Sequence, residues 1–380
     1  MLGRSNQGIL GSWWWRVDKI TMFMVFLLII FGIICVSSAS FFVAKRIDLQ
    51  SSFFIKKHIW YAFIAMSIVI STSFFSSKKI SELSVSLYLI SIFLIFTTLF
   101  FGIEIKGSKR WLYFFGLSIQ PSEFMKIFFV LVNAKILSLL SDNDFSSKSD
   151  KAKIYFASFI LCVFSMISVI LQPDIGMACL IFCTWFCQIF ISGAPMLLLL
   201  LPIGCFVAGL GFAYTFFDHV HYRINNFLFG VANSNEMYQI KQSFAALKSG
   251  GLFGLGPGQG KIKAALPDSH TDFIFSVIGE EFGIISCIIL IIIYVTIVIN
   301  SIKKIEHETN IYNILAVVGL SMQILIQSMI NIGVNIQLLP AKGMTLPFIS
   351  YGGSSIMSSA LLIGIILSIN KKKYGDVIKI

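Results

Sequence analysis

Residues 282–300 have the sequence FGIISCIILIIIYVTIVIN, a run without a charged side chain. A helix of roughly 20 apolar residues spans the hydrocarbon core of a bilayer. Backbone groups inside lipid must hydrogen-bond within their own segment, because no water is available there. The run therefore predicts a transmembrane helix over about 273–300.

Similar apolar runs recur along the whole chain. We place them at about 20–42, 59–75, 83–101, 122–140, 154–171, 176–191, 196–217, 273–300, 311–334 and 354–370. Of the 380 residues, 57% are hydrophobic and 12% are charged, whereas a soluble domain carries about 25% charged residues. The sequence predicts a single polytopic membrane domain over 1–380, an all-α integral membrane protein with about ten transmembrane helices.

The distribution of charge favours a membrane protein over a nucleic-acid-binding one. Despite a net charge of +11, the Lys and Arg residues punctuate the apolar runs and form no basic stripe, so no nucleic-acid partner is expected. Ten spans place both termini on one side, and the Lys/Arg density is higher on that side, which makes it cytoplasmic. Large loops at about 102–121, 218–272 and 336–353 then lie outside, the longest between spans seven and eight.

These outer loops carry most of the Gly, Pro and loop-borne polar residues, so we expect the chemistry on the outer face. Two segments, KGSKRW (106–111) and QPSEFMK (120–126), lead into the fourth span. Glu123 and Lys126 are three residues apart and share a helical face. Either they pair to hold helices together, or Lys126 acts with Arg110 to hold an anionic lipid headgroup.

Three further segments are candidates for a functional or a structural role. In QPDIG (172–176), Asp174 either caps the following helix or binds a metal ion or substrate. A short amphipathic helix is expected over Tyr238 to Lys248, at the membrane surface. The glycine-rich stretch GGLFGLGPGQGK (250–261) either brings backbone amides close to a phosphate or forms a lid or hinge.

The segment PDSHTDF (267–273) leads into the eighth span. Asp272 is either the N-cap of that helix or a carboxylate that accepts a proton from a hydroxyl nucleophile. Spacing alone favours the cap. His270 shares this position at the mouth of the bundle, and Glu280 and Glu281, two turns deeper, are expected to face its interior.

The segment from Asn331 to Ser355 holds prolines, glycines and several hydroxyls after the ninth span. Such irregular backbone is tolerated at membrane depth only where it is buried in protein or lines a cavity. Lys342 is the sole charge of this segment and a second candidate for contact with an anionic headgroup.

Several of these segments together resemble the SEDS family (shape, elongation, division and sporulation), polytopic glycosyltransferases that polymerise peptidoglycan from lipid II. The matching blocks are KGSKRW (106–111), QPSE (120–123), QPDIG (172–176), HTDFIF (270–275) with Glu280 and Glu281, and LPFISYGGSS (346–355). The stretch PAKGMTLP (340–347) looks more like the cell-division branch (FtsW type) than the elongation branch (RodA type). Asp268, Met177 and Ala341 depart from residues common in the family.

The resemblance implies that Asp272 is the essential outer-face carboxylate and the catalytic residue, which overrides the preference for a cap. Candidate substrate-binding residues from the same blocks are Arg110, Trp111, Glu123, Lys126, Asp174, His270, Lys342, Ser350 and Ser354. A divalent cation (Mg²⁺ or Mn²⁺), with ligands that the sequence does not identify, is expected to assist, and no organic cofactor is expected.

The predicted function is polymerisation of lipid II at the outer face of a bacterial cytoplasmic membrane during cell division, with both termini cytoplasmic. Arg110, Lys126 and Lys342 are the candidate cations for the leaving pyrophosphate. The expected partners are a class B penicillin-binding protein transpeptidase and other divisome membrane proteins. Two alternatives are a lipid II flippase or transporter and a non-catalytic divisome scaffold, although a scaffold has no need of intramembrane charges.

Overall fold

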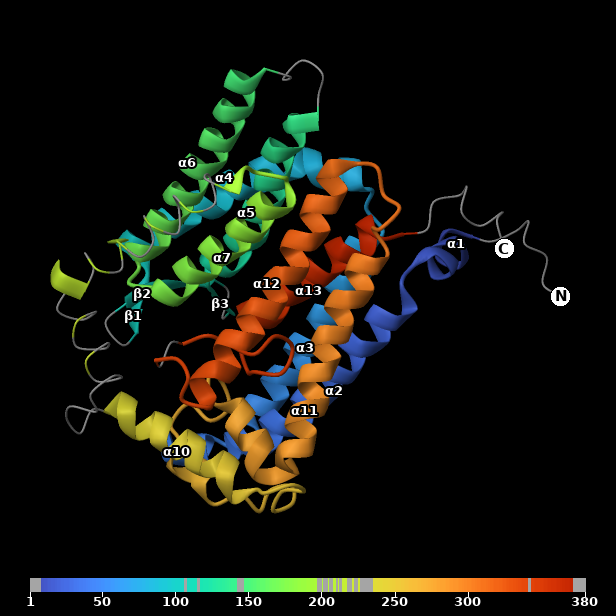
Figure 1. The fold of residues 1–380 in the computed structure, drawn as a ribbon. Coiled ribbons are helices and arrows are strands. Elements are labelled where there is room, and N and C mark those ends of the chain that lie inside the picture. Colours follow the sequence, from blue (N-terminus) through green and yellow to red (C-terminus); the bar gives the residue numbers. More distant parts are fainter. Residues whose placement is uncertain are drawn as a thin grey trace.

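A computed structural model describes residues 8–105, 108–114, 117–141, 147–196, 235–340 and 343–371, with isolated residues between these ranges at 200, 204, 208, 209, 211, 214–216, 221 and 225. The described chain is a bundle of long helices. One end of the bundle carries a small sheet and helix α10 (Asn235–Ser249), and the opposite end carries the short helix α1 (Ile9–Arg16) (Figure 1).

The described ranges contain nine apolar helices of the bundle. They are α2 (Lys19–Arg46), α3 (Phe53–Ser73), α4 (Ser77–Phe101), α5 (Pro121–Ser138), α6 (Lys148–Ile170), α7 (Ile175–Ile191), α11 (Ile274–Lys303), α12 (Ile311–Asn335) and α13 (Gly353–Ile369). Seven of them are long and apolar enough to cross a membrane, whereas α7 and α13 have 17 residues each.

These nine helices coincide with nine of the ten predicted spans, which confirms a multi-pass, predominantly helical membrane protein. The remaining span, 196–217, falls where only scattered residues are described. Short elements complete the described fold: α1 (Ile9–Arg16), α10 (Asn235–Ser249) and the 3-10 helices η2 (Leu139–Ser141) and η4 (Ile262–Ala265). Helix α10 covers the predicted amphipathic helix.

A three-stranded antiparallel sheet occupies the segment between α4 and α5, where the sequence predicted only a loop. Its strands are β1 (Ile103–Ile105), β2 (Ser108–Phe114) and β3 (Leu117–Ile119). Trp111 faces Ile103 across the β1–β2 pair, and Leu112 faces Ile119 across the β2–β3 pair. Pairing satisfies the backbone of a segment that lies next to the membrane helices.

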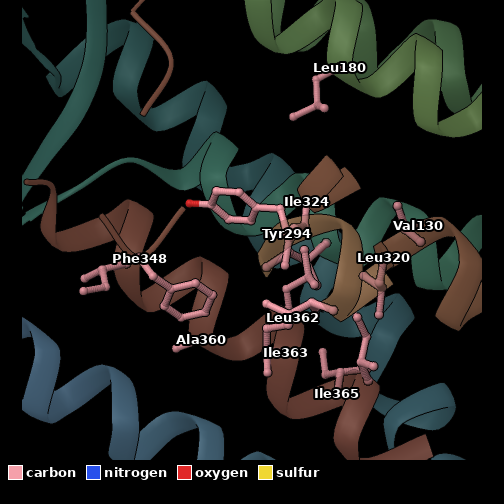
Figure 2. Packing of buried hydrophobic residues seen from close by; sticks show 14 of the residues in the cluster. Val130, Leu180, Tyr294, Leu320, Ile324, Phe348, Ala360, Leu362, Ile363 and Ile365 are labelled. Carbon is pink, nitrogen blue, oxygen red and sulfur yellow. The ribbon is translucent and has the colours of Figure 1, made fainter. Parts of the chain in front are cut away.

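Helices α5 and α12 form the centre of the bundle. In their most apolar windows, 61% and 67% of the residues are buried, against 33–39% in the other five long spans. The interior is packed by branched aliphatic side chains such as Val130 on α5, Leu320 on α12 and Ile363 on α13 (Figure 2). Most of the remaining apolar surface is therefore available to lipid.

Helix α11 is interrupted at Gly283, whose φ of 78° lies in a region that favours glycine. The carbonyls of Glu280 and Glu281 accept hydrogen bonds from the amides of Leu255 (2.9 Å) and Gly256 (3.0 Å). In return, the amides of Ile284 and Ile285 donate to the carbonyls of Gly251 (3.0 Å) and Leu252 (3.4 Å). The glycine-rich loop thus replaces the helical bonds that the break removes.

This exchange revises the phosphate interpretation of the loop 250–261. The amide of Gly254 donates to the carbonyl of Gly250 and that of Gln259 to the carbonyl of Gly256, at 2.8 and 3.1 Å. Together with the amides of Leu255 and Gly256, which donate to α11, four amides of the loop therefore already have partners within the protein. Gly250, Gly254 and Gly260 pack closely against α11, and the phosphate interpretation remains a prediction for the other amides of the loop.

Candidate active site

Asp272 lies in the turn that leads into α11, and α11 packs beside α10 (Figure 1). Its side chain is half-buried. Helix α11 begins at Ile274 with Phe273 at the N-cap position, so Asp272 stands one residue outside the cap that spacing favoured. In the first turn, the amide of Ser276 donates to Oδ1 of Asn335 on α12, at 3.2 Å.

The backbone around Asp272 is held by donors from other segments. The loop from 336 to 352, here called the return loop, contributes the amide of Tyr351 to the carbonyl of His270 (2.8 Å) and the hydroxyl of Ser350 to the carbonyl of Thr271 (2.6 Å). The carbonyl of Asp272 accepts from Nδ2 of Asn331 (2.9 Å) and of Asn335 (3.1 Å). Three successive carbonyls are therefore fixed, and the candidate base projects from a rigid turn.

The return loop also approaches the carboxylate itself. Gly343 is exposed, and a Cβ built on it would lie 3.3 Å from Oδ2 of Asp272. A glycine here keeps one side of the carboxylate open. Lys342, the neighbouring candidate cation, lies outside the described residues.

His270 packs its ring against two aromatic side chains, Phe54 of α3 and Tyr351, with centroids 4.7 and 5.3 Å away. Burial lowers the pKa of the His270 imidazole to about 4, while Asp268 opposes that shift. The ring is therefore neutral at pH 7. His58 of α3, fully buried near the same Tyr351 ring, is a site neighbour that the sequence analysis did not identify.

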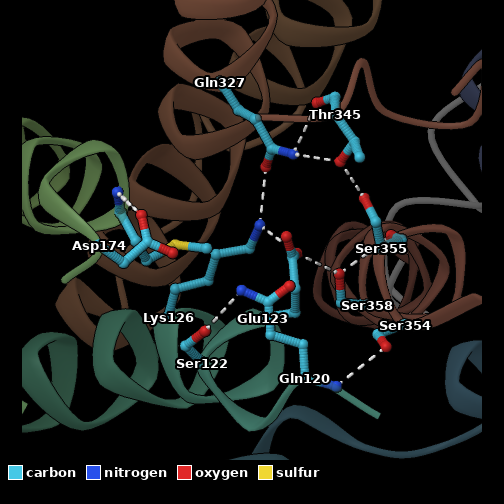
Figure 3. Close-up of polar contacts among 11 residues, drawn as sticks. Gln120, Ser122, Glu123, Lys126, Asp174, Gln327, Thr345, Ser354, Ser355 and Ser358 are labelled. Carbon is cyan, nitrogen blue, oxygen red and sulfur yellow. Dashed lines mark hydrogen bonds and ion pairs between the residues drawn. The ribbon is translucent and has the colours of Figure 1, made fainter. Parts of the chain in front are cut away.

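Glu123 and Lys126 form the predicted pair deep in the bundle. Lys126 Nζ lies 2.6 Å from Glu123 Oε2 and donates to Oε1 of Gln327 on α12 at 2.7 Å. The Ser358 hydroxyl of α13 donates to the same Glu123 oxygen at 3.0 Å. Figure 3 shows the ammonium group pointing between Glu123 and Gln327. The pair links α5, α12 and α13, as the helix-bridging interpretation of these residues requires.

This polar network continues into the return loop. Gln327 Nε2 donates to the carbonyl of Thr345 at 3.0 Å, and the Thr345 hydroxyl hydrogen-bonds to that of Ser355 (Figure 3). Ser354 accepts from the amide of Gln120 and donates to the carbonyl of Ser118, each at 3.0 Å. These bonds tie the return loop to α12 and α13, and they tie the start of α13 to β3 and to the residue before α5.

Arg110 and Asp174 form a third group, between the sheet and α7. The Arg110 guanidinium pairs with Asp174 at 3.1 Å and donates to the carbonyls of Gln172 (2.9 Å) and Pro173 (2.6 Å). Asp174 also caps α7 by accepting from the amide of Met177 at 3.2 Å, which confirms the cap interpretation. Trp111, next to Arg110 on β2, is half-buried. Arg110 thus fixes the turn before α7.

Glu280 and Glu281 face the interior, as expected. Glu280 accepts from the amides of Ile262 (2.7 Å) and Lys263 (2.9 Å) in η4. Glu281 forms a buried ion pair with the Lys263 side chain and accepts from the Ser38 hydroxyl of α2 at 2.6 Å. These contacts anchor the segment before Asp272 to α11 and α2.

The structure therefore places the predicted site residues in three groups: Asp272, His270 and Ser350 at the mouth; Glu123, Lys126 and Ser354 around the return loop; and Arg110, Trp111 and Asp174 beside the sheet. Within the described residues, no three His, Cys, Asp or Glu side chains form a group that could hold a metal ion. The described residues therefore do not supply a ligand set for the expected divalent cation.

Comparison with known proteins identifies the family of this chain. The family model FTSW_RODA_SPOVE, described as cell cycle protein, matches residues 18–375. The chain is similar to the probable peptidoglycan glycosyltransferase FtsW of Caulobacter vibrioides (33% identity, covering 98% of this chain and 94% of that protein). It is also similar to stage V sporulation protein E of Bacillus subtilis (32% identity, covering 93% and 97%).

Two solved structures share the fold. One, on the structural coordination of polymerization and crosslinking by a peptidoglycan synthase complex, has a chain with 22% identity and a TM-score of 0.78, covering 93% of this chain and 97% of that chain. The other, the rod shape determining protein RodA of Thermus thermophilus, has 23% identity and a TM-score of 0.68, covering 94% and 97%. With a family match over residues 18–375 and relatives above 30% identity across almost the whole chain, this protein belongs to the FtsW/RodA/SpoVE family of cell cycle proteins.

Proposed function

We propose that the protein is a peptidoglycan glycosyltransferase that polymerises lipid II at the outer face of the bacterial cytoplasmic membrane during cell division. The observation that carries this proposal is the half-buried carboxylate of Asp272, held on a turn whose three carbonyls are fixed by α12 and the return loop. Curated relatives that are named FtsW peptidoglycan glycosyltransferases support the reaction class. Both termini are cytoplasmic in this proposal.

In the proposed reaction, Asp272 accepts the proton of the sugar 4-hydroxyl of lipid II. The hydroxyl oxygen then forms a bond to the anomeric carbon of the growing glycan, and the bond from that carbon to undecaprenyl pyrophosphate breaks. The pyrophosphate leaves with the electron pair. A positioned general base contributes on the order of 10²- to 10⁴-fold to such a step, and rigid backbone keeps its carboxylate within reach of the hydroxyl.

Stabilisation of the leaving pyrophosphate falls to Lys342 in this proposal. Lys126 and Arg110 already bind Glu123 and Asp174 inside the protein, so their charges serve the fold first. A class B penicillin-binding protein is the proposed partner, supported by the fold shared with a chain of a peptidoglycan synthase complex.

The function is tested with labelled lipid II in proteoliposomes that hold the protein and its transpeptidase partner. Polymerisation predicts long glycan chains on a gel. A flippase would instead move labelled lipid II between leaflets without producing chains, and a scaffold would do neither. Absence of chains from folded, partner-bound protein would refute the proposal.

A further inference from the structure

Helix α12 presents a row of amide side chains toward the candidate site. Gln327, Asn331 and Asn335 are spaced four residues apart, so they lie along one side of the helix. All three are at most 2% exposed. A buried amide that lacks partners costs free energy, and all three side chains bond to segments of the site.

Asn331 divides its two amide protons between two segments. One goes to the carbonyl of Asp272 at 2.9 Å and the other to the carbonyl of Met344 in the return loop at 2.6 Å. The two N–H bonds of an amide have a fixed angle. One planar group therefore sets the spacing between the Asp272 turn and the loop whose Gly343 lies against the Asp272 carboxylate.

Asn335 holds the same carbonyl from the side of the helix. Its Nδ2 donates to Asp272 at 3.1 Å, and its Oδ1 accepts from the amide (3.2 Å) and hydroxyl (2.6 Å) of Ser276. One side chain thereby joins the first turn of α11 to the carbonyl that precedes it. The peptide plane that carries Asp272 is fixed from two directions.

We propose that Asn331 and Asn335 are positioning residues for the reaction: they touch no reacting atom and act by aiming the Asp272 carboxylate. This inference rests on the proposed function, because it assumes that Asp272 is the base. Misplacement of a reacting group by about 1 Å costs on the order of 100-fold in rate. Loss of one of the two anchors is expected to lower turnover without changing how much substrate binds.

The test measures kcat and KM for lipid II polymerisation by Asn331→Ala in proteoliposomes with the transpeptidase partner. We expect kcat to fall by at least about 10-fold with KM within about two-fold of wild type. Asn313→Ala is the matched control. It truncates the same side chain at the other end of α12, where Asn313 is buried and bonds to Ser77. The control is expected to keep wild-type turnover at equal folded fraction. Asn331→Leu, which retains the side-chain volume, serves as a second variant.

A double-mutant comparison separates positioning from structural support. If Asn331 acts through Asp272, adding Asn331→Ala to Asp272→Asn lowers the residual rate no further. The proposal is overturned by wild-type kcat in Asn331→Ala, by full additivity in the double mutant, or by failure of both Asn331 variants to fold while Asn313→Ala folds. Wild-type turnover in Asp272→Asn alone would instead refute the role of Asp272, so the two failures are distinguishable.

Discussion

Replacing Lys126 with Met tests whether this lysine is a structural partner or a headgroup cation. In the structure, its ammonium group lies 2.6 Å from Glu123, and the two side chains are 2% and 8% exposed. The substitution keeps the length of the chain but leaves the Glu123 carboxylate buried with the Ser358 hydroxyl as a neutral donor.

The expected loss follows from that burial. Removing one partner of a buried ion pair typically destabilises a protein by about 3–5 kcal/mol, because the other charge remains uncompensated. We expect Lys126→Met to lose free energy of unfolding in this range. The double variant Glu123→Gln/Lys126→Met should lose less than Lys126→Met alone, since no buried charge is left unpaired.

The assay is reversible unfolding of the purified protein in detergent micelles. Lys153→Met is the matched control, because Lys153 pairs with Asp150 at 2.9 Å with the same three-residue spacing, yet is 73% exposed. An exposed pair is worth about 0–1 kcal/mol. The structural role would be refuted if the unfolding free energy of Lys126→Met lay within about 1 kcal/mol of wild type. Strictly additive losses of unfolding free energy in the double variant would refute it as well. A loss of lipid II affinity at unchanged stability would restore the headgroup interpretation.

Gly283→Ala should destabilise the protein by at least about 2 kcal/mol in the same unfolding assay, because its Cβ would overlap a backbone carbonyl of the glycine-rich loop. The control Gly193→Ala has a similar positive φ but lies in open space, so it should cost less. Equal losses of stability in the two variants would contradict this. Gly343→Ala should lower polymerisation by about 10-fold with unchanged stability, because its methyl group would lie 3.3 Å from Asp272 Oδ2, and wild-type turnover would argue against an acceptor approach from this side. Since burial lowers the His270 pKa from 6.5 to about 4, the unfolded chain binds a proton first as the pH falls. The contribution of the buried, neutral His270 to the free energy of unfolding is therefore intact above pH 6.5. Roughly 3 kcal/mol of it is lost as the pH falls from 6.5 to 4. His270→Phe should show a shallower loss of stability over that range, and an unchanged slope would contradict the burial of a neutral ring.

The membrane helices were predictable because the signal is local. Uninterrupted apolar length decides whether a segment such as 282–300 spans a bilayer, and no distant contact changes that. The spacing of Glu123 and Lys126 likewise predicted their pairing within one helix. Local capping chemistry also made Asp174 a candidate N-cap of α7, as the structure shows it to be.

The features missed by the sequence analysis depend on contacts between distant segments. Spacing favoured Asp272 as a cap, but α11 has Phe273 at its N-cap position, and the turn before it is held by Asn331 and Asn335 of α12. The packing of the glycine-rich loop against α11 was missed because its partner, the break at Gly283, lies in another element. The sheet of residues 103–119 was missed for a different reason, because its strands are short and lie among loop residues.

The measurement that tests the central claim most directly is polymerisation of labelled lipid II by wild type and by Asp272→Asn, both folded and both with the transpeptidase partner. Removing the base while keeping the shape of the side chain should lower the rate by about 10²- to 10⁴-fold and leave the unfolding free energy close to that of the wild type. Glycan chains formed at the wild-type rate by Asp272→Asn would contradict the account.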